Sequence, residues 1–124
     1  MLRTFRYGDA WHPIRIRMDW FRDVGIPRLR DIAGEEGRAA PMLCPRIRLR
    51  LTDSPLPDED RVAGEGNLVQ VHSDLAGLQE LGCSYVVLDT YADDVDALKD
   101  SEPSWRMLSV LAEKVLDLEN QTVR

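Results

Sequence analysis

Cysteine, histidine and aromatic residues are scarce in this sequence, and their scarcity excludes several kinds of site. The 124 residues include two cysteines and two histidines, and aromatic residues make up 6% of the chain. Cys44 and Cys83 lack C-x-x-C spacing and stand far from the histidines, so a structural zinc site is not expected. Each cysteine lies in or beside an apolar run, where a free thiol behaves as a small hydrophobe. A reduced, cytoplasmic protein fits this pattern best.

Long apolar runs and several catalytic motifs are also missing. No run approaches the roughly 18 apolar residues that span a bilayer, and the start, MLRTFRYGDA, lacks the apolar stretch of a signal peptide. We therefore expect a soluble, unexported protein that does not enter a membrane. Without a G-x-S-x-G elbow, a Walker loop or a complete G-x-G-x-x-G, the hydrolase, kinase and Rossmann interpretations lose their main support.

The composition that remains suits a single globular domain over residues 1–124. Hydrophobic residues make up 44% of the chain and charged residues 31%, and this length is enough to bury one core. The 22 acidic side chains outnumber the 16 basic ones, which disfavours general binding to nucleic acid or to an anionic membrane. A local basic cluster can still bind an anion.

Strand-like and helix-like segments alternate along the chain. The expected strands cover residues 9–14, 46–51 and 84–89. The expected helices cover residues 26–38, 67–82 and 101–120. Asn67 and Gly82 are the expected cap and stop of the second helix. Five apolar residues of the third are expected to face inward: Trp105, Leu108, Leu111, Val115 and Leu118. This alternation predicts right-handed βαβ crossovers and a parallel sheet, interrupted by a long loop at 52–67 that is either functional or mobile.

Three stretches carry a resemblance to a known family. They are RYGDAWHP (6–13), EEGRAAP (35–41) and GEGNLVQVHSDLAGLQELGCSYVVLD (64–89). In order and spacing they resemble the C-terminal part of the luciferase-like monooxygenase family, particularly its branch of oxidoreductases that use coenzyme F420. The resemblance implies an α/β fold that is a partial (β/α)8 TIM barrel, with about three βα units and parallel strands. A complete barrel needs about 250 residues.

The resemblance also implies a chemistry. Members of the family transfer hydride or oxygen with reduced FMN or coenzyme F420 bound at the barrel mouth, acting on a small-molecule substrate. We therefore interpret the chain as a truncated flavin- or F420-dependent oxidoreductase, which would act by assembling with another copy. A noncatalytic fragment or dimerising interaction module derived from the family is the alternative. A third possibility is a small α/β binding domain whose likeness to the family is accidental.

Candidate site residues follow from the rule that barrel active sites lie at the carboxyl ends of strands. His12 is the candidate catalytic residue, because imidazole can donate a proton near neutral pH. The alternative is that His12 merely packs at a strand exit. Cofactor binding is expected from residues at strand ends and before the second helix: Arg50, Asp53, Gly64, Gly66, Asn67, Asp89 and Thr90. The glycines and Asn67 would present helix N-terminal amides to a phosphate, unless they form an ordinary flexible loop.

The stretch RIRLRL, residues 46–51, places three arginines on one side of an expected strand. Inside a closed barrel, unpaired guanidinium groups would carry a prohibitive desolvation cost. One solution is that Arg50, nearest the mouth, pairs with a phosphate or carboxylate of a ligand. The other is that no barrel closes and this face is open to water or to another chain. We favour the open face, which also suggests a homo-oligomer formed through the exposed sheet.

Overall fold

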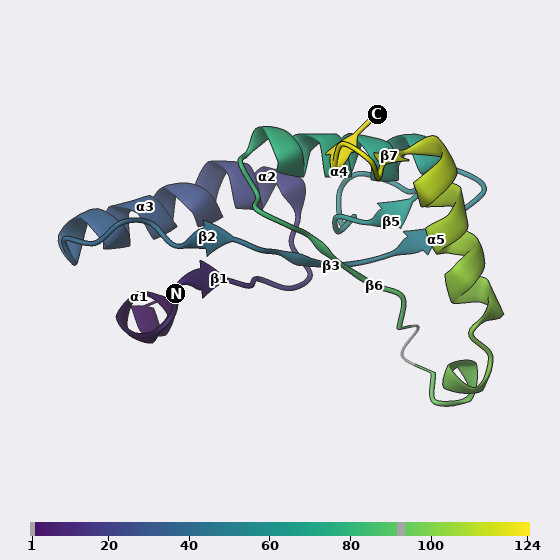
Figure 1. The fold of residues 1–124 in the computed structure, drawn as a ribbon, viewed down its shortest axis with the longest axis horizontal. Helices are drawn as coiled ribbons and strands as arrows, with labels where there is room; N and C mark the ends of the chain where they lie inside the picture. The colour runs from purple at the N-terminus through teal and green to yellow at the C-terminus, as the bar shows by residue number, and fades with distance from the viewer. Residues whose placement is uncertain (1, 92–93) are drawn as a thin grey trace.

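The computed structural model describes residues 2–91 and 94–124 as a mixed α/β structure (Figure 1). Its helices are α1 (Leu2–Tyr7), α2 (Met18–Trp20), the π-helical η1 (Phe21–Gly25), α3 (Ile26–Glu35), α4 (Leu68–Glu80), the 3-10 helix η2 (Asp96–Lys99) and α5 (Glu102–Lys114). Its strands are β1 (Ala10–Trp11), β2 (Met42–Leu43), β3 (Arg46–Arg48), β4 (Arg50–Leu51), β5 (Glu65–Gly66), β6 (Val87–Asp89), β7 (Leu116–Asp117) and β8 (Thr122–Val123).

The strands that precede α5 pair in parallel. β1 pairs with β2, β3 with β6 and β4 with β5. Because β2, β3 and β4 follow one another along residues 42–51, this extended segment is the centre of the arrangement. The Arg46 amide donates to Pro13 beside β1, whereas the Leu49 amide donates to Asp89 at the end of β6. β1 and β6 therefore flank the central segment on opposite edges, in chain order and in the parallel sense that the sequence predicts.

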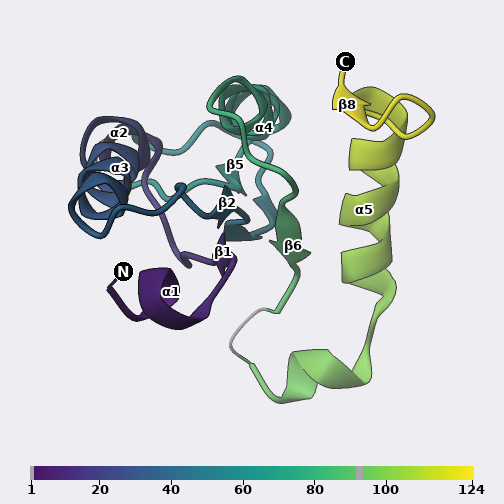
Figure 2. The same ribbon diagram turned by 60° about the vertical axis from the view of Figure 1, so that its left-hand side comes forward.

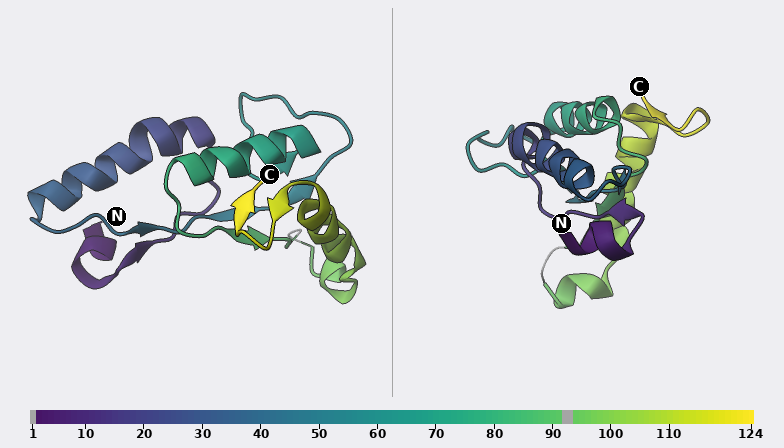
Figure 3. Two further views of the ribbon diagram at one scale, coloured as in Figure 1. Left: turned by 45° about the horizontal axis from the view of Figure 1, so that its top comes forward. Right: turned by 90° about the vertical axis from the view of Figure 1, so that its left-hand side faces the viewer.

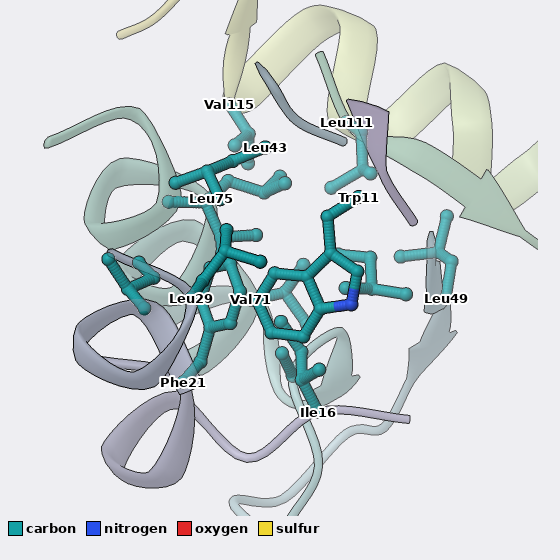
Figure 4. Packing of buried hydrophobic residues seen from close by; sticks show 14 of the residues in the cluster. Trp11, Ile16, Phe21, Leu29, Leu43, Leu49, Val71, Leu75, Leu111 and Val115 are labelled. Carbon is teal, nitrogen blue, oxygen red and sulfur yellow. The ribbon is translucent and has the colours of Figure 1, made fainter. Parts of the chain in front are cut away.

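Helices cover one face of these strands. Segments α2–α3 and α4 lie on the same side of the strands (Figures 1 and 3). Ile47 and Leu49 alternate with the arginines of the central segment and are 0% and 2% exposed. They join a core that draws on β1, α3, α4 and α5 (Figure 4). On the opposite face, Ile14 is 61% exposed and Met42 is 50% exposed, so this face of the sheet is uncovered.

The predicted positions of α3 and α4 are confirmed. Periodic apolar residues of both helices are buried: Ile26, Leu29, Ala33, Val71, Leu75 and Leu78. Asn67 is the N-cap of α4. Gly82 follows the helix with a φ of 83°, a left-handed conformation that glycine adopts without strain.

The prediction for the C-terminal end of the chain is partly wrong. Helix α5 ends at Lys114, and β7 and β8 then form an antiparallel hairpin where the sequence predicts continued helix. Leu111 and Val115 are buried as expected, but Trp105 is 63% exposed and Leu118 is 66% exposed. Met107 and Leu108 pack against the core beside Leu111 and Val115, so Trp105 and Leu118 lie outside the inward side of this segment. Figure 2 shows α5 beyond β6, at one end of the arrangement. At the other end, residues 2–7 form a helix that the apolar pattern did not indicate.

Candidate functional site at the carboxyl end of the parallel strands

A hollow of about 630 Å³ lies just beyond the carboxyl end of β1. It is lined by residues 13–17 and by the turns of α2 and η1 that follow. The wall includes apolar side chains that reach solvent: Ile14 is 61% exposed, Val24 49% and Trp20 39%. Asp19, Asp23, Arg15 and Arg17 supply charge around them. We name this feature the indole hollow.

Trp20 owes its position to the π-helical turn and to Gly25. The Trp20 ring lies over Gly25 so closely that a Cβ there would come within 2.9 Å of the indole. Below it, the centroids of Trp11 and Trp20 are 6.3 Å apart, with the rings inclined at 57°. Such tilted aromatic pairs are favourable beyond their buried area. Single π-helical turns recur at functional sites, and this one sets an indole at the rim of the hollow.

A second, smaller hollow lies on the uncovered face of the sheet. It encloses about 190 Å³ and is lined by Ile14, Arg15, Arg46, Arg48, Asp89 and Tyr91. Ile14 and Arg15 belong to both hollows, so they form a common wall. Arg46 and Arg48 alternate along β3 and therefore share a face, and Arg48 is in register with Asp89 of β6. We name this feature the arginine hollow.

Asp89 is the carboxylate that the arginine hollow contains. Its Oδ2 accepts hydrogen bonds from Arg46 Nε at 3.0 Å and Arg46 Nη2 at 2.6 Å, and its Oδ1 accepts the Tyr91 amide at 3.0 Å. Burial opposes ionisation of Asp89. The Tyr91 amide, the Arg46 hydrogen bonds and the charges of Arg46 and Arg48 outweigh burial and lower the pKa of this carboxyl below its usual range. Asp89 is therefore ionised at neutral pH and held by Arg46.

The predicted phosphate site before α4 is already filled by the chain itself. Gln70 Nα donates to Asn67 Oδ1 at 3.0 Å, and Asn67 Nα donates to Gln70 Oε1 at 3.1 Å, which completes a capping box. The Gln70 side chain also exchanges two hydrogen bonds with the Leu56 backbone. The Gly64 amide donates to Asp74 Oδ2 at 3.0 Å. Gly66 pairs with Leu51. The geometry thus gives the phosphate prediction no support.

Asp74 is 3% exposed and anchors the long loop to α4. Arg61 Nη1 and Nη2 donate to the two carboxylate oxygens of Asp74 at 2.6 and 2.9 Å. These hydrogen bonds, opposed by burial, raise the pKa of the Arg61 guanidinium. Gly64 belongs to the same loop and lies against β3, where any Cβ would collide with the Arg48 carbonyl. The pair is structural, because it lies in neither hollow.

The remaining predicted residues are scattered. His12 follows β1 with its Nδ1 2.7 Å from the Cys44 carbonyl oxygen, and the described linings of both hollows do not include it. Arg50 lies exposed on β4, and Asp53 lies exposed in the loop beyond it. Thr90 is half-buried between Asp89 and Tyr91. Asp89 is thus the member of the predicted set that lines a hollow, and catalysis by His12 stays a prediction.

Sequence reasoning missed Trp20 and underused Arg15, Arg46 and Arg48. The arginine alternation was a usable signal, because it marked a polar face on an otherwise apolar strand. Trp20 gave no local signal, since its place depends on the π-helical turn and Gly25. The expected strand 9–14 ends at the Ile14 bridge, because Arg15 adopts a left-handed φ of 49°.

Metal and thiol chemistry find no geometric support in the part of the chain that the structure describes. There, no group of three or more His, Cys, Asp or Glu side chains could hold a metal ion. Burial, with a smaller effect of Cys44, raises the pKa of Cys83 to about 11, so this side chain is a neutral thiol at neutral pH. Within residues 2–91 and 94–124, no helix combines the length and apolar character that a membrane span requires.

No family model matches this chain. Searches of curated proteins and of solved structures also found no match. The resemblance to the luciferase-like family therefore remains a prediction, and function has to be argued from the two hollows.

Proposed function

We propose that the chain is the C-terminal portion of a luciferase-like (β/α)8 barrel that binds FMN or coenzyme F420 at the carboxyl end of its strands. The observation that carries this proposal is the position of the indole hollow, immediately after a parallel strand flanked by helices on one face. Barrels and open parallel sheets both place ligands at this end. The complete oxidoreductase would need the strands that this chain lacks, supplied by another copy or by a longer polypeptide.

The indole hollow fits a planar cofactor in size and chemistry. Ligand pockets generally enclose about 300 to 1,000 Å³ and combine apolar walls with few polar groups, and this hollow encloses about 630 Å³. Trp20 and Ile14 would contact the ring system, and Arg15 would lie near its anionic substituent. FMN or coenzyme F420 would supply hydride transfer, and this chain would orient the ring and exclude water from one side of it.

Fluorescence titration with FMN and with coenzyme F420 tests this proposal. We expect saturable quenching with the wild-type chain, loss of binding in Trp20→Ala, and unchanged binding in Trp105→Ala. Trp105 is a matched control because it is an exposed indole on α5, outside both hollows. Equal binding by the two variants, or no titration of the wild-type chain by either cofactor, contradicts the proposal.

A second candidate function is a noncatalytic module that dimerises through the uncovered face of the sheet. The observation that favours it is a group of exposed apolar side chains just beyond β1 and on β2 and β6: Ile14 (61%), Met42 (50%) and Val87 (38%). Burying them against a second copy would remove apolar surface from water. Light scattering should then give a dimer that Val87→Arg dissociates. A monomer at micromolar concentration contradicts this alternative.

A further inference from the structure

We propose that His12 is a positioning residue, whose imidazole supplies the backbone hydrogen bond that Pro13 cannot make. The bond joins the end of β1 to the central segment, residues 42–51, at the point where the chain enters the wall of the indole hollow. The hydrogen bond itself is independent of any cofactor. Only its effect on cofactor binding rests on the proposed function.

The parallel pairing around Pro13 lacks one donor. The register does not change across this residue. Before it, the Cys44 amide donates to the Trp11 carbonyl oxygen at 2.9 Å, and after it the Arg46 amide donates to the Pro13 carbonyl oxygen at 2.9 Å. Hydrogen bonds between parallel strands alternate in direction, so the bond between these two would run from the amide of residue 13 to the Cys44 carbonyl. Proline has no N–H to donate.

The His12 side chain supplies the missing donor. Its Nδ1 lies 2.7 Å from the Cys44 carbonyl oxygen. A carbonyl oxygen only accepts hydrogen bonds, so Nδ1 carries the hydrogen. Cys44 is 1% exposed, and a buried carbonyl that loses its donor costs stability because water does not replace the bond. Removal of the His12 ring should therefore weaken the pairing at Pro13.

The two histidines of the chain bind backbone oxygens through opposite ring nitrogens. His72 uses Nε2, which lies 2.7 Å from the Arg124 main-chain oxygen. The neutral His12 ring therefore has its hydrogen on Nδ1 and a lone pair on Nε2, whereas the neutral His72 ring has the reverse arrangement. Neutral His12 can accept a proton at Nε2 but has none there to give, so any proton transfer at this nitrogen has to begin with acceptance.

The bond lies immediately before the wall of the indole hollow. Residues 13–17 line this hollow, and Arg15 turns the chain out of the strand with its φ of 49°. The His12 ring and the Arg46 amide thus fix the chain next to the turn. Loss of the first bond should displace Ile14, which belongs to the wall.

The tautomer of each histidine gives the first test. Long-range ¹H–¹⁵N NMR spectra of the wild-type chain near pH 8, where imidazole is mainly neutral, should show His12 protonated on Nδ1 and His72 protonated on Nε2. His12→Ala and His72→Ala assign the signals. A His12 ring protonated on Nε2, or one that averages both tautomers, overturns the inference.

A double-mutant cycle in urea gives the second test. His12→Ala should lower the equilibrium constant for folding about tenfold. The same change should have little effect in the Pro13→Ala background, because residue 13 then has an N–H for the Cys44 carbonyl. His72→Ala is the matched control and should change little, since Arg124 is exposed and its oxygen can bind water. Equal losses from His12→Ala in both backgrounds overturn the inference.

Fluorescence titration with FMN and coenzyme F420 tests the effect on the hollow. Binding should be about tenfold weaker in His12→Ala, recover in the His12→Ala/Pro13→Ala double variant, and stay unchanged in His72→Ala. Wild-type affinity in His12→Ala overturns the positioning role. A wild-type chain that binds neither cofactor contradicts the proposed function instead, and the tautomer and the urea cycle then decide whether the hydrogen bond exists.

Discussion

Alternate residues of the parallel strands form two faces, of which one packs against helices and the other is exposed to solvent. On the covered face, Ile47 is 0% exposed and packs among helical side chains, whereas Ile14 on the uncovered face is 61% exposed. Apolar burial stabilises a fold in proportion to the area removed from water. The covered face therefore contributes most of the stabilisation by apolar burial. The uncovered face can carry charged side chains, which would be costly to bury in a core.

Two aspartate–arginine pairs repeat this contrast. The Asp74 and Arg61 side chains are 3% and 13% exposed, whereas those of Asp89 and Arg46 are 23% and 47% exposed. Each pair has a contact of 2.6 Å between nitrogen and oxygen. Equal distance does not imply equal energy, because water screens the second pair far more than the first.

Neutralising the buried member of these pairs should have the largest effect. Asp74→Asn leaves the half-buried Arg61 guanidinium with the exposed Asp58 carboxylate, 3.5 Å from Nε, as its remaining counter-charge, which costs about 3 kcal/mol of the free energy of unfolding. Asp89→Asn on the exposed pair should cost about 1 kcal/mol or less. Urea unfolding followed by circular dichroism measures both. Equal losses would show that the uncovered face is shielded from water in solution.

Isoleucine-to-alanine substitutions on the two faces compare the contributions of buried and exposed apolar side chains to stability. Ile47→Ala should destabilise the fold by about 2 to 5 kcal/mol, because the core cannot collapse fully into the space that is left. Ile14→Ala should change stability by about 0.5 kcal/mol or less. The readout is again the urea midpoint at constant slope. A large loss for Ile14→Ala at high protein concentration alone would instead reveal a partner on the uncovered face.

Acid should produce the smallest effect, through Asp89. Its folded pKa is lowered, so its stabilising contribution is complete above the unfolded value of about 3.9 and is lost as the pH falls through the folded value. The difference in unfolding free energy between the wild-type chain and Asp89→Asn should be constant near neutral pH and vanish in acid. A difference that grows in acid would contradict the assigned direction.

Local sequence signals predicted the helices better than they predicted the site. The ends of α4 follow from Asn67 and Gly82, because capping depends on residues within one turn. The prediction that Trp105 faces inward was wrong for the opposite reason. The apolar stripe predicts a buried side of the helix, but burial also requires a neighbouring segment, and in the described part of the chain α5 has none at Trp105. The parts of the structure that the sequence did not indicate have the same origin. Trp20 and the Arg61–Asp74 pair depend on contacts between segments, and no spacing rule encodes them.

The side-chain amide of Gln70 ties the long loop to the first turn of α4, and this has a consequence for how the molecule opens. One group holds the backbone of both Leu56 and Asn67, so any movement of the Gln70 side chain breaks hydrogen bonds to both segments. Backbone amides in the two segments should exchange with deuterium at matched rates. A stretch rich in proline and glycine would then resist proteases for as long as the helix beside it stays folded.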